Sequence, residues 1–566
     1  YGSLTALLAL IYFGSIIGAL PHTLANARIV QQDLQRLLPV ASLLLLALLL
    51  GAFRTWRGLL VMAIPFLAAP LAVSVVYLTA GTMSAMALGF GIVLLGISVD
   101  FAIHLYLSLS QPGVSGQAAL RHLRRPVLLA FCTTIGVFMV LLFSTVPSHR
   151  QMAALAIVGI TVAILFAWLL VPTIARIQPP GLLGRIALRP SGARSLPFAA
   201  LVGWMVLVGM SLGLWPQLRY NGDLRVLDVP VPEIEADEEL FRSTWRQEID
   251  QAFVVAEGNS LEEALRRNDQ IDEQLRSRSV AGYQTLAGIL PSSATQARHL
   301  AAWRDFWASR RPEVTQKLRS LGEEAGFSPQ AFAPFLAWLE QEPATLQPRV
   351  LLASPLRPLL SSFLQLEDHG APGGEQGALV VTIAPDTPEF RTAIRALQTA
   401  DPGIRLLSPA SWRARIEDLL RVDIGRLSLA AAFLVVILLA LFFRSPRKVL
   451  AALSPVLSAL AAMVLFSFLT SGQLNLMHVL MSLMVIGISV DYGIFVVNTH
   501  RKPISGSTLT AVSLCAASTL SGFGVLALAG HPALHSLGTT VLVGITAAWP
   551  TALWIAPALL SLGRRR

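Results

Sequence analysis

The strongest constraint on the fold is where acidic residues are missing. Of the 33 Asp and Glu residues, only Asp33, Asp100 and Asp491 lie outside residues 216–426. The two flanking segments, 1–215 and 427–566, instead contain many apolar stretches of about 20 residues, the length that crosses a bilayer as a helix. The whole chain is 13% charged, whereas typical soluble domains are about 25% charged. We therefore predict a polytopic α-helical membrane protein.

The apolar stretches form two sets of five, separated by one further stretch and a polar region. We expect helices near 38–53, 58–78, 84–108, 126–145 and 151–174, then at 196–215, and finally near 427–443, 448–469, 475–499, 508–528 and 536–561. The predicted domains are a first five-helix set (37–175), a linker (176–195), a single helix (196–215), a soluble domain (216–426) and a second five-helix set (427–563).

The first 36 residues are interpreted separately. They resemble either the run-in to the first of these helices or the remnant of a soluble domain that starts before Tyr1. The apolar residues 4–20 either span the membrane or close that soluble domain, and we favour the second interpretation.

The two five-helix sets look like a repeat. FRTWRGLL at 53–60 matches FRSPRKVL at 443–450, GISVD at 96–100 matches GISVD at 487–491, and VGIT at 158–161 matches VGIT at 543–546. The spacing between partners is 390, 391 and 385 residues. Near-constant spacing over a long segment indicates internal duplication. Transporters commonly place their ion sites at the interface of such repeats.

Basic residues predict which way the helices run. The loops after the first, third and fifth helices of each set hold 17 Arg and Lys residues, whereas the opposite loops hold only Arg150. Because positive loops stay in the cytoplasm, we expect the 216–426 domain on the outer side. The net charge of +10 then reflects topology, and nucleic acid is not an expected partner.

Residues 216–426 alternate between strand and helix signals. QAFVVAEG (251–258), ALVVTIA (378–384) and IRLLS (404–408) are typical of strands. Residues 260–275 and 388–399 are typical of helices, and Ser260 with Glu263 predicts a capping box. We expect two α+β lobes, with a mostly helical middle (293–345) and a loop at 369–377. The aromatic residues of the middle segment favour core packing over a lipid-binding cleft.

Each GISVD motif places an aspartate near the middle of a predicted membrane helix. An ionisable side chain at that depth is costly and is a functional candidate by default. Burial favours the neutral carboxyl form and a nearby hydroxyl favours the charged form, so such a group can take up a proton and release it. Two carboxylates at equivalent repeat positions, Asp100 and Asp491, favour a functional role over a structural hydrogen bond between helices.

The helix repeat predicts the neighbours of these aspartates. His104 shares a helix face with Asp100, and Asn498 shares one with Asp491. Gly96 and Gly487 precede the aspartates by four residues, where a glycine lets another helix approach closely. The candidate hydroxyl partners on the following helix of each set are Thr133, Thr134, Ser518 and Thr519.

The combination of FRS at a helix end, the GISVDYG motif and the repeated helix plan resembles the resistance–nodulation–division (RND) superfamily, with its MMPL (mycobacterial membrane protein large) branch the most similar. The resemblance implies a twelve-helix plan, of which about 11 helices are visible, and an outward-facing α+β porter domain. It implies that Asp100 and Asp491 relay protons with Tyr492 as the tyrosine partner, and that His104 contributes. It also implies a multi-pass location in the bacterial inner membrane with the porter domain on the periplasmic side.

Two features depart from the RND pattern. Phe101 stands where the pattern has tyrosine, so one hydroxyl is missing in the first repeat, and His104 either compensates or the two halves are energetically unequal. The first helix and first porter domain are missing except for the remnant expected in residues 1–36.

We therefore predict proton-driven export of hydrophobic or lipid-like molecules, with protons, a lipid-like substrate and the membrane as partners, and the lipid part rests on the resemblance. A homo-oligomer is compatible with the sequence. The alternative is a non-transporting sensor or receptor of the sterol-sensing, Patched-like kind. An intramembrane aspartyl protease is disfavoured because its usual Gly-x-Gly-Asp is absent, so we expect no enzyme. No cofactor or metal is expected: Cys132 and Cys515 are typical of small buried hydrophobic residues, and HPALH at 531–535 has no third ligand.

Overall fold

The computed structural model describes residues 19–53, 56–110, 116–175, 196–221, 224–245, 251–328, 330–341, 343–367, 377–500 and 505–561. The predictions for residues 1–18, for the linker 176–195, for the loop at 369–376 and for the basic positions 54, 501–502 and 564–566 lie outside these ranges. The chain forms two compact units, which we describe separately. The helical unit contains Tyr1–Asp237 and Ile416–Arg566, and the α+β unit contains Glu238–Arg415.

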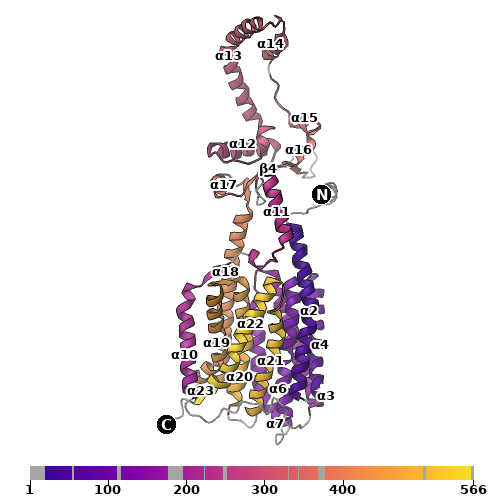
Figure 1. The fold of residues 1–566 in the computed structure, drawn as a ribbon, viewed down its shortest axis with the longest axis vertical. Coiled ribbons are helices and arrows are strands. Elements are labelled where there is room, and N and C mark those ends of the chain that lie inside the picture. Colours follow the sequence, from indigo (N-terminus) through magenta and orange to yellow (C-terminus); the bar gives the residue numbers. More distant parts are fainter. Residues whose placement is uncertain are drawn as a thin grey trace. The chain divides into compact units, whose positions relative to one another are not determined.

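The first repeat of the helical unit follows the predicted order of five helices (Figure 1). Its elements are α2 (Ala19–Phe53), α3 (Trp56–Leu59), η1 (Leu60–Met62), α4 (Ala63–Ala80), α5 (Ala85–Ser98), α6 (Asp100–Leu109), α7 (Gly116–Leu141) and α8 (Pro147–Ile174). Only Val99 separates α5 from α6, and its backbone dihedral angles are helical. The pair therefore covers the single span predicted at 84–108.

The second repeat has the same plan after the single helix α10 (Leu196–Leu214). Its elements are α18 (Pro409–Phe443), α19 (Pro446–Thr470), α20 (Leu476–Thr499), α21 (Ser505–Leu526), α22 (Pro532–Pro550), the π-helical η5 (Thr551–Ile555) and α23 (Ala556–Ser561). Among the described residues, 10 helices are long and apolar enough to cross a membrane. The α5–α6 pair accounts for the eleventh predicted span.

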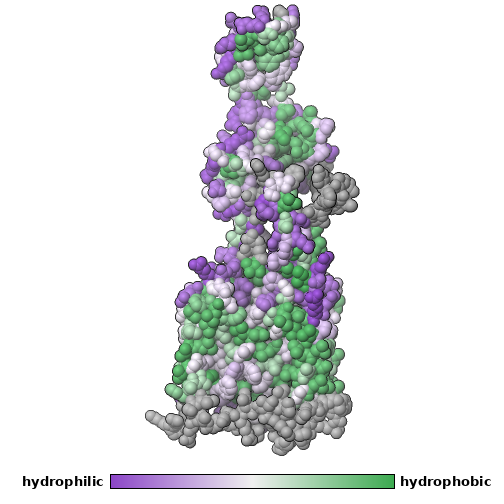
Figure 2. Space-filling model, viewed as in Figure 1, coloured by the Kyte–Doolittle hydropathy of each residue, from purple (hydrophilic) through white to green (hydrophobic). Residues whose placement is uncertain are grey.

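The surface of the helical unit matches a lipid-facing protein. Large apolar side chains such as Leu169, Leu212 and Phe433 are about two-thirds exposed, at 68%, 70% and 67%. In Figure 2 hydrophobic residues cover most of the visible side of this unit. Soluble proteins rarely expose so much contiguous apolar surface, and a bilayer removes the cost of exposing it.

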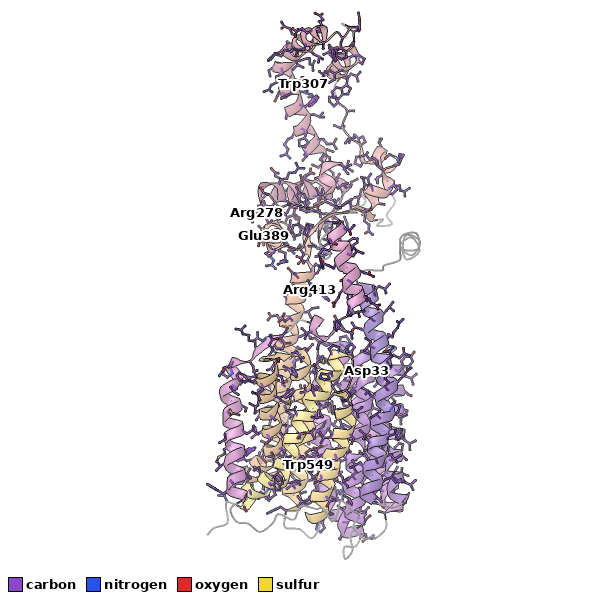
Figure 3. The ribbon with its side chains drawn as sticks, in the orientation of Figure 1. Asp33, Arg278, Trp307, Glu389, Arg413 and Trp549 are labelled. Atoms are coloured by element: carbon purple, nitrogen blue, oxygen red, sulfur yellow. The ribbon has the colours of Figure 1, made fainter. Side chains whose placement is uncertain are left out.

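The long helices α2 and α18 are tied to the opposite repeat by one carboxylate each. Asp33 of α2 accepts hydrogen bonds from the backbone nitrogens of Gly530 and His531, at 3.1 and 2.9 Å. Asp423 of α18, offset by 390 residues, accepts from Ser144 Oγ at 2.9 Å and from the Thr145 nitrogen at 3.0 Å. Asp33 is 8% exposed within α2 and is labelled in Figure 3. The helix expected near 38–53 begins earlier than predicted, at Ala19.

Short segments complete the helical unit. β1 (Arg219–Asn221) follows η2 (Trp215–Gln217) and pairs in parallel with β6 (Gln473–Asn475), which precedes α20. η3 (Leu224–Leu227) and α11 (Pro232–Trp245) then lead out of the unit. The strand pairing fixes the end of α10 to the loop between α19 and α20.

The α+β unit contains one four-stranded sheet in the order β3-β4-β2-β5, and all adjacent strands are antiparallel. The strands are β2 (Gln251–Gly258), β3 (Leu364–Glu367), β4 (Gly377–Pro385) and β5 (Ile404–Leu407). α12 (Leu261–Ser277) and α17 (Pro388–Ala400) share a core with alternate residues of β2, including Val254, whereas Phe253 on the other face is 37% exposed. The prediction of two lobes was wrong, because β2 pairs with both β4 and β5 and joins their segments in one sheet.

The remaining elements of this unit are mostly helical, as the sequence predicts for its middle segment. They are η4 (Leu286–Gly288), α13 (Ser293–Glu324), α14 (Ala333–Glu340), α15 (Pro348–Leu352) and α16 (Arg357–Ser361). Ser260 caps α12 by accepting from the Glu263 nitrogen, but the Glu263 carboxylate returns to the nitrogen of Asn259 at 2.8 Å. The predicted capping box therefore closes one residue early.

Candidate functional site

Asp100 and Asp491 line the same small cavity between the two repeats. Asp100 is the first residue of α6 and Asp491 lies within α20. The cavity has about 10 Å³ open to water and is lined by Ile97, Asp100, Phe101, His104, Ile488, Asp491, Tyr492, Phe495 and Cys515. That is about the space one water molecule needs. The structure thus brings both candidate carboxylates to one small cavity.

Asp491 of the second repeat is held by hydroxyls of the first. Thr134 of α7 donates to Asp491 Oδ2 at 2.8 Å, and Thr133 reaches Oδ1 at 3.3 Å. Both threonines are buried, at 1% and 0% exposure. Thr134 also lies 3.4 Å from the Gly487 carbonyl oxygen, one turn before Asp491.

Asp100 of the first repeat is held in the same way by the second. Ser518 of α21 donates to Asp100 Oδ1 at 2.8 Å and is fully buried. Cys515, one turn earlier on α21, places its sulfur 3.5 Å from the Asp100 backbone oxygen. Each carboxylate is therefore hydrogen-bonded across the repeat interface. Apolar walls favour the neutral carboxyl and the hydroxyl donors favour the charged one, and this combination suits a group that exchanges protons.

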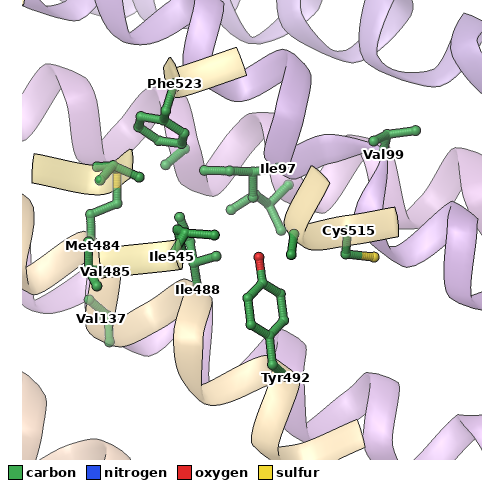
Figure 4. Close-up of a cluster of buried hydrophobic side chains, with 14 of the residues drawn as sticks. Ile97, Val99, Val137, Met484, Val485, Ile488, Tyr492, Cys515, Phe523 and Ile545 are labelled. Carbon is green, nitrogen blue, oxygen red and sulfur yellow. The ribbon is translucent and has the colours of Figure 1, made fainter. Parts of the chain in front are cut away.

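Tyr492 follows Asp491 on α20 and is 2% exposed. Its hydroxyl lies 3.5 Å from Thr519 Oγ1 of α21, so this contact stays within the second repeat. Figure 4 shows the hydroxyl pointing among apolar side chains, with Ile97 and Cys515 nearby. In the first repeat the equivalent residue Phe101 also lines the cavity but has no hydroxyl.

His104 lies one turn after Asp100 and stacks on Phe495. The two ring centroids are 3.6 Å apart and the ring planes are inclined by 10°. Phe495 is offset from His104 by 391 residues, so equivalent positions of the two repeats face each other. Asn498, which was predicted on the Asp491 face, does not line the cavity, and its Nδ2 has no partner among the described residues.

The two predicted packing glycines behave differently. A Cβ on Gly96 would lie 3.0 Å from the Ser518 carbonyl oxygen, so α5 and α21 approach closely there. A Cβ on Gly487 would be in ordinary contact with Val137, at 3.7 Å. The close approach of α20 is at Gly493 instead, where a Cβ would lie 2.1 Å from the Ala452 oxygen of α19.

Sequence reasoning missed two neighbours of the carboxylates. Cys515 lines the cavity. Gly493 allows the close approach of α20 to α19. Both residues lie within two helical turns of an aspartate or its hydroxyl partner, and this position was the signal that could have identified them. Cys132 is exposed rather than buried. Among the described residues, no group of three or more His, Cys, Asp or Glu side chains could hold a metal ion.

A second polar site lies where α22 begins. His531 caps α22 by accepting from the Ala533 nitrogen. Burial lowers the pKa of His531 below its ordinary value, and the nearby Asp33 and Asp228 oppose that shift. A neutral imidazole is therefore favoured beside the Asp33 contact.

Comparison with known proteins supports the architecture. No family model matches the chain. It is 25% identical over 186 residues to "Putative membrane protein MJ1562" of Methanocaldococcus jannaschii, a match that covers 29% of this chain and 46% of that protein. The crystal structure of SecDF from Thermus thermophilus, a translocon-associated membrane protein, has a TM-score of 0.52 and 13% identity. That match covers 95% of this chain and 63% of SecDF, so the chain spans less than two-thirds of the length of either protein.

The likeness to SecDF shows the fold. The chain is a polytopic helical membrane protein with a SecDF-like arrangement of repeated helices and small sheets. The fold class predicted from the sequence is confirmed at this level.

Proposed function

We propose that this protein uses the proton-motive force to export hydrophobic or lipid-like molecules across the bacterial inner membrane. Protons would cross at Asp100 and Asp491. The observation that carries the proposal is that the two carboxylates share one cavity and each is hydrogen-bonded by the opposite repeat. A change in protonation would then act on the interface between the repeats, where it can bias their packing.

The resemblance to the MMPL branch and the α+β unit support the export of lipid-like molecules. In α13 and α14 the indole rings of Trp303 and Trp338 lie 6.2 Å apart, yet Trp338 is 53% exposed and Phe306 45% exposed. These aromatic residues are not part of the core of the unit, so core packing does not account for them. They offer an apolar contact surface on the side that the basic loops predict to be extracytoplasmic.

The test uses the full chain in proteoliposomes with an imposed pH gradient. Proton flux and movement of a fluorescent phospholipid are followed for the wild type, Asp100→Asn and Asp491→Asn. Glu313→Gln is a matched control, since Glu313 forms only an exposed pair with Lys317. We expect flux in the wild type and the control, and a fall to the level of empty liposomes in both aspartate variants.

Two results would overturn the proposal, and a third would reject only its substrate class. Flux that persists in folded Asp100→Asn and Asp491→Asn would make the carboxylates structural. A wild type without flux would favour a sensor or receptor. Proton flux without lipid movement would retain the proton step and reject the substrate class.

A further inference from the structure

A polar stripe runs along α6 from the central cavity toward the end of the helix that the basic loops predict to be cytoplasmic. Asp100, His104 and Ser108 occupy positions i, i+4 and i+8, so they lie on one helix face. Each step advances about 6 Å along the axis. Ser110 follows directly after the last helical residue, Leu109.

Three polar atoms beyond Asp100, two on the stripe and one in Ser110 after it, are buried without partners. His104, Ser108 and Ser110 are 2%, 1% and 8% exposed. His104 Nδ1, Ser108 Oγ and Ser110 Oγ have no hydrogen-bond partner in the part of the chain that the structure describes. Buried polar groups in folded proteins are almost always paired. Three unpaired groups within seven residues therefore call for an explanation other than packing.

The positions of α20 equivalent to His104 and Ser108 do not continue the stripe, and the unpaired Nδ2 of Asn498 belongs to a partly exposed side chain that does not line the cavity. Phe495 stands at the position of His104, and Thr499 at the position of Ser108. Thr499 Oγ1 donates to the Phe495 carbonyl oxygen at 2.7 Å, the usual way a helical hydroxyl satisfies itself. Packing alone does not require an imidazole at residue 104, because the second repeat places a phenyl ring at the equivalent position of the same stack.

We propose that His104 and Ser108 form the proton route between the two carboxylates and the cytoplasmic side, and that this route exists only in the first repeat. The inference rests on the proposed function. A proton leaves the Asp100 carboxyl and reaches one ring nitrogen of His104 across the cavity, which has room for about one water molecule. The imidazole then releases a proton from its other nitrogen toward Ser108. Asp100 is left as a carboxylate that accepts the next proton from the Asp491 side.

The first experiment measures proton flux in the same proteoliposomes. His104→Phe copies the ring found at residue 495, so the stack is retained while the proton carrier is lost. We expect a fall of at least tenfold with an unchanged melting temperature. Thr499→Ala is the matched control on α20 and should keep wild-type flux. His104→Gln provides a second variant with a different side-chain volume.

A reciprocal exchange tests whether the route belongs to one repeat. The double variant His104→Phe with Phe495→His moves the imidazole to α20, where Thr499 is already satisfied. We expect flux to stay low. Restored flux would overturn the one-sided route, since an imidazole in either repeat would then suffice.

Sided labelling provides a readout that does not depend on flux. A thiol placed at residue 108 by Ser108→Cys should react with a small, charged, membrane-impermeant thiol reagent only from the cytoplasmic side of membrane vesicles. A thiol placed by Thr499→Cys, at a site that is also 1% exposed, should not react. Peptide mass spectrometry separates these sites from the native Cys132 and Cys515.

The outcomes separate the two proposals. If Asp100→Asn abolishes flux but His104→Phe leaves it intact, the carboxylate relay stands and the route through His104 is wrong. If Asp100→Asn also leaves flux intact, the proposed function and this inference both fail. Equal labelling at residues 108 and 499 would reject the route even where flux falls.

Discussion

In the first repeat α2 ends at Phe53 and in the second α18 ends at Phe443, and both helices are 35 residues long. Each repeat places a carboxylate on its third apolar span, and hydroxyl groups of each repeat donate hydrogen bonds to the carboxylate of the other. A second carboxylate of each repeat, Asp33 or Asp423, accepts hydrogen bonds from the opposite repeat. The shared parts are therefore the charges and the contacts that cross the repeat interface.

The repeats differ in the residues next to the shared carboxylates. After the aspartate the first repeat has Phe101, Ala102 and His104, whereas the second has Tyr492, Gly493 and Phe495. The tyrosine hydroxyl and the close helix contact two residues after the aspartate, at Gly493, are in the second repeat, and the imidazole is in the first. The comparison shows that a duplicated site can keep its charges while its packing and proton-carrying neighbours are divided between the two halves.

The largest expected effect is on packing in the second repeat. In Gly493→Ala the new Cβ would lie 2.1 Å from the Ala452 oxygen, a backbone atom that cannot move without shifting α19. Overpacking of this kind costs about 3 kcal/mol. We expect a clear loss of folded protein, measured as detergent-stable yield and melting temperature.

The first repeat supplies the control for this prediction. Ala102 occupies the equivalent position, and Ala102→Gly should cost only about 0.5–1 kcal/mol through the lower helix preference of glycine. Similar losses in both variants would show that the two repeats pack alike here, contrary to the structure.

The next effect concerns the hydroxyls that cross between repeats. Thr134→Val and Ser518→Ala each remove a 2.8 Å hydrogen bond to a carboxylate. A hydrogen bond to a charged group contributes about 1.5–3 kcal/mol, so we expect proton flux to fall by about tenfold or more in both variants. A large effect in one variant and none in the other would show that only one carboxylate exchanges protons.

A smaller effect distinguishes the two glycines of the repeated motif. Gly96→Ala brings a Cβ to 3.0 Å from the Ser518 backbone oxygen, and Gly487→Ala brings one to 3.7 Å from Val137. We expect about 1 kcal/mol of destabilisation for the first and no loss for the second. Melting temperatures measured in one detergent test this difference, and equal values would contradict it.

The smallest effect is a pH dependence of the loop before α22. Because burial lowers the pKa of His531 in the folded protein, only the unfolded chain takes up this proton just below the ordinary value of 6.5. The stability from neutral His531 is full above pH 6.5 and falls as the pH drops below it, until the folded-state pKa is reached.

A conservative variant isolates that contribution. His531→Asn keeps a side chain that caps helices well but does not titrate. Melting curves from pH 7.5 to 5 should show a decline in the wild type that is about 1 °C larger than in the variant. The first-repeat loop has no side-chain cap before α8, so the capping contribution is specific to the loop before α22. Parallel curves for the two proteins would assign the decline to other groups.

The sequence was sufficient to predict the membrane helices and the internal repeat. Apolar runs of membrane length allow few alternatives, and the two GISVD motifs fix the relative register of the halves. The strand at 251–258 was predicted to the residue, because its apolar run ends at Gly258 and is followed by the cap Ser260.

The partners of the carboxylates could not be predicted from the sequence. Thr133 and Ser518 were visible as candidates, but helix periodicity describes one helix at a time and does not say which neighbour it faces. The same limit explains why Gly493 was missed and Gly487 was chosen. The single sheet was missed because the central position of β2 depends on pairings more than 100 residues away.

The crossed hydroxyls also have a consequence for how the chain is made. Ser518 is 418 residues away from Asp100 in sequence. At a synthesis rate of about 5–20 residues per second, Ser518 is synthesised roughly 20–80 s after Asp100. During that interval a newly inserted carboxyl has no permanent donor, so biogenesis favours an uncharged, protonated Asp100. The insertion of α21 is then also the step that first allows this side chain to carry its charge.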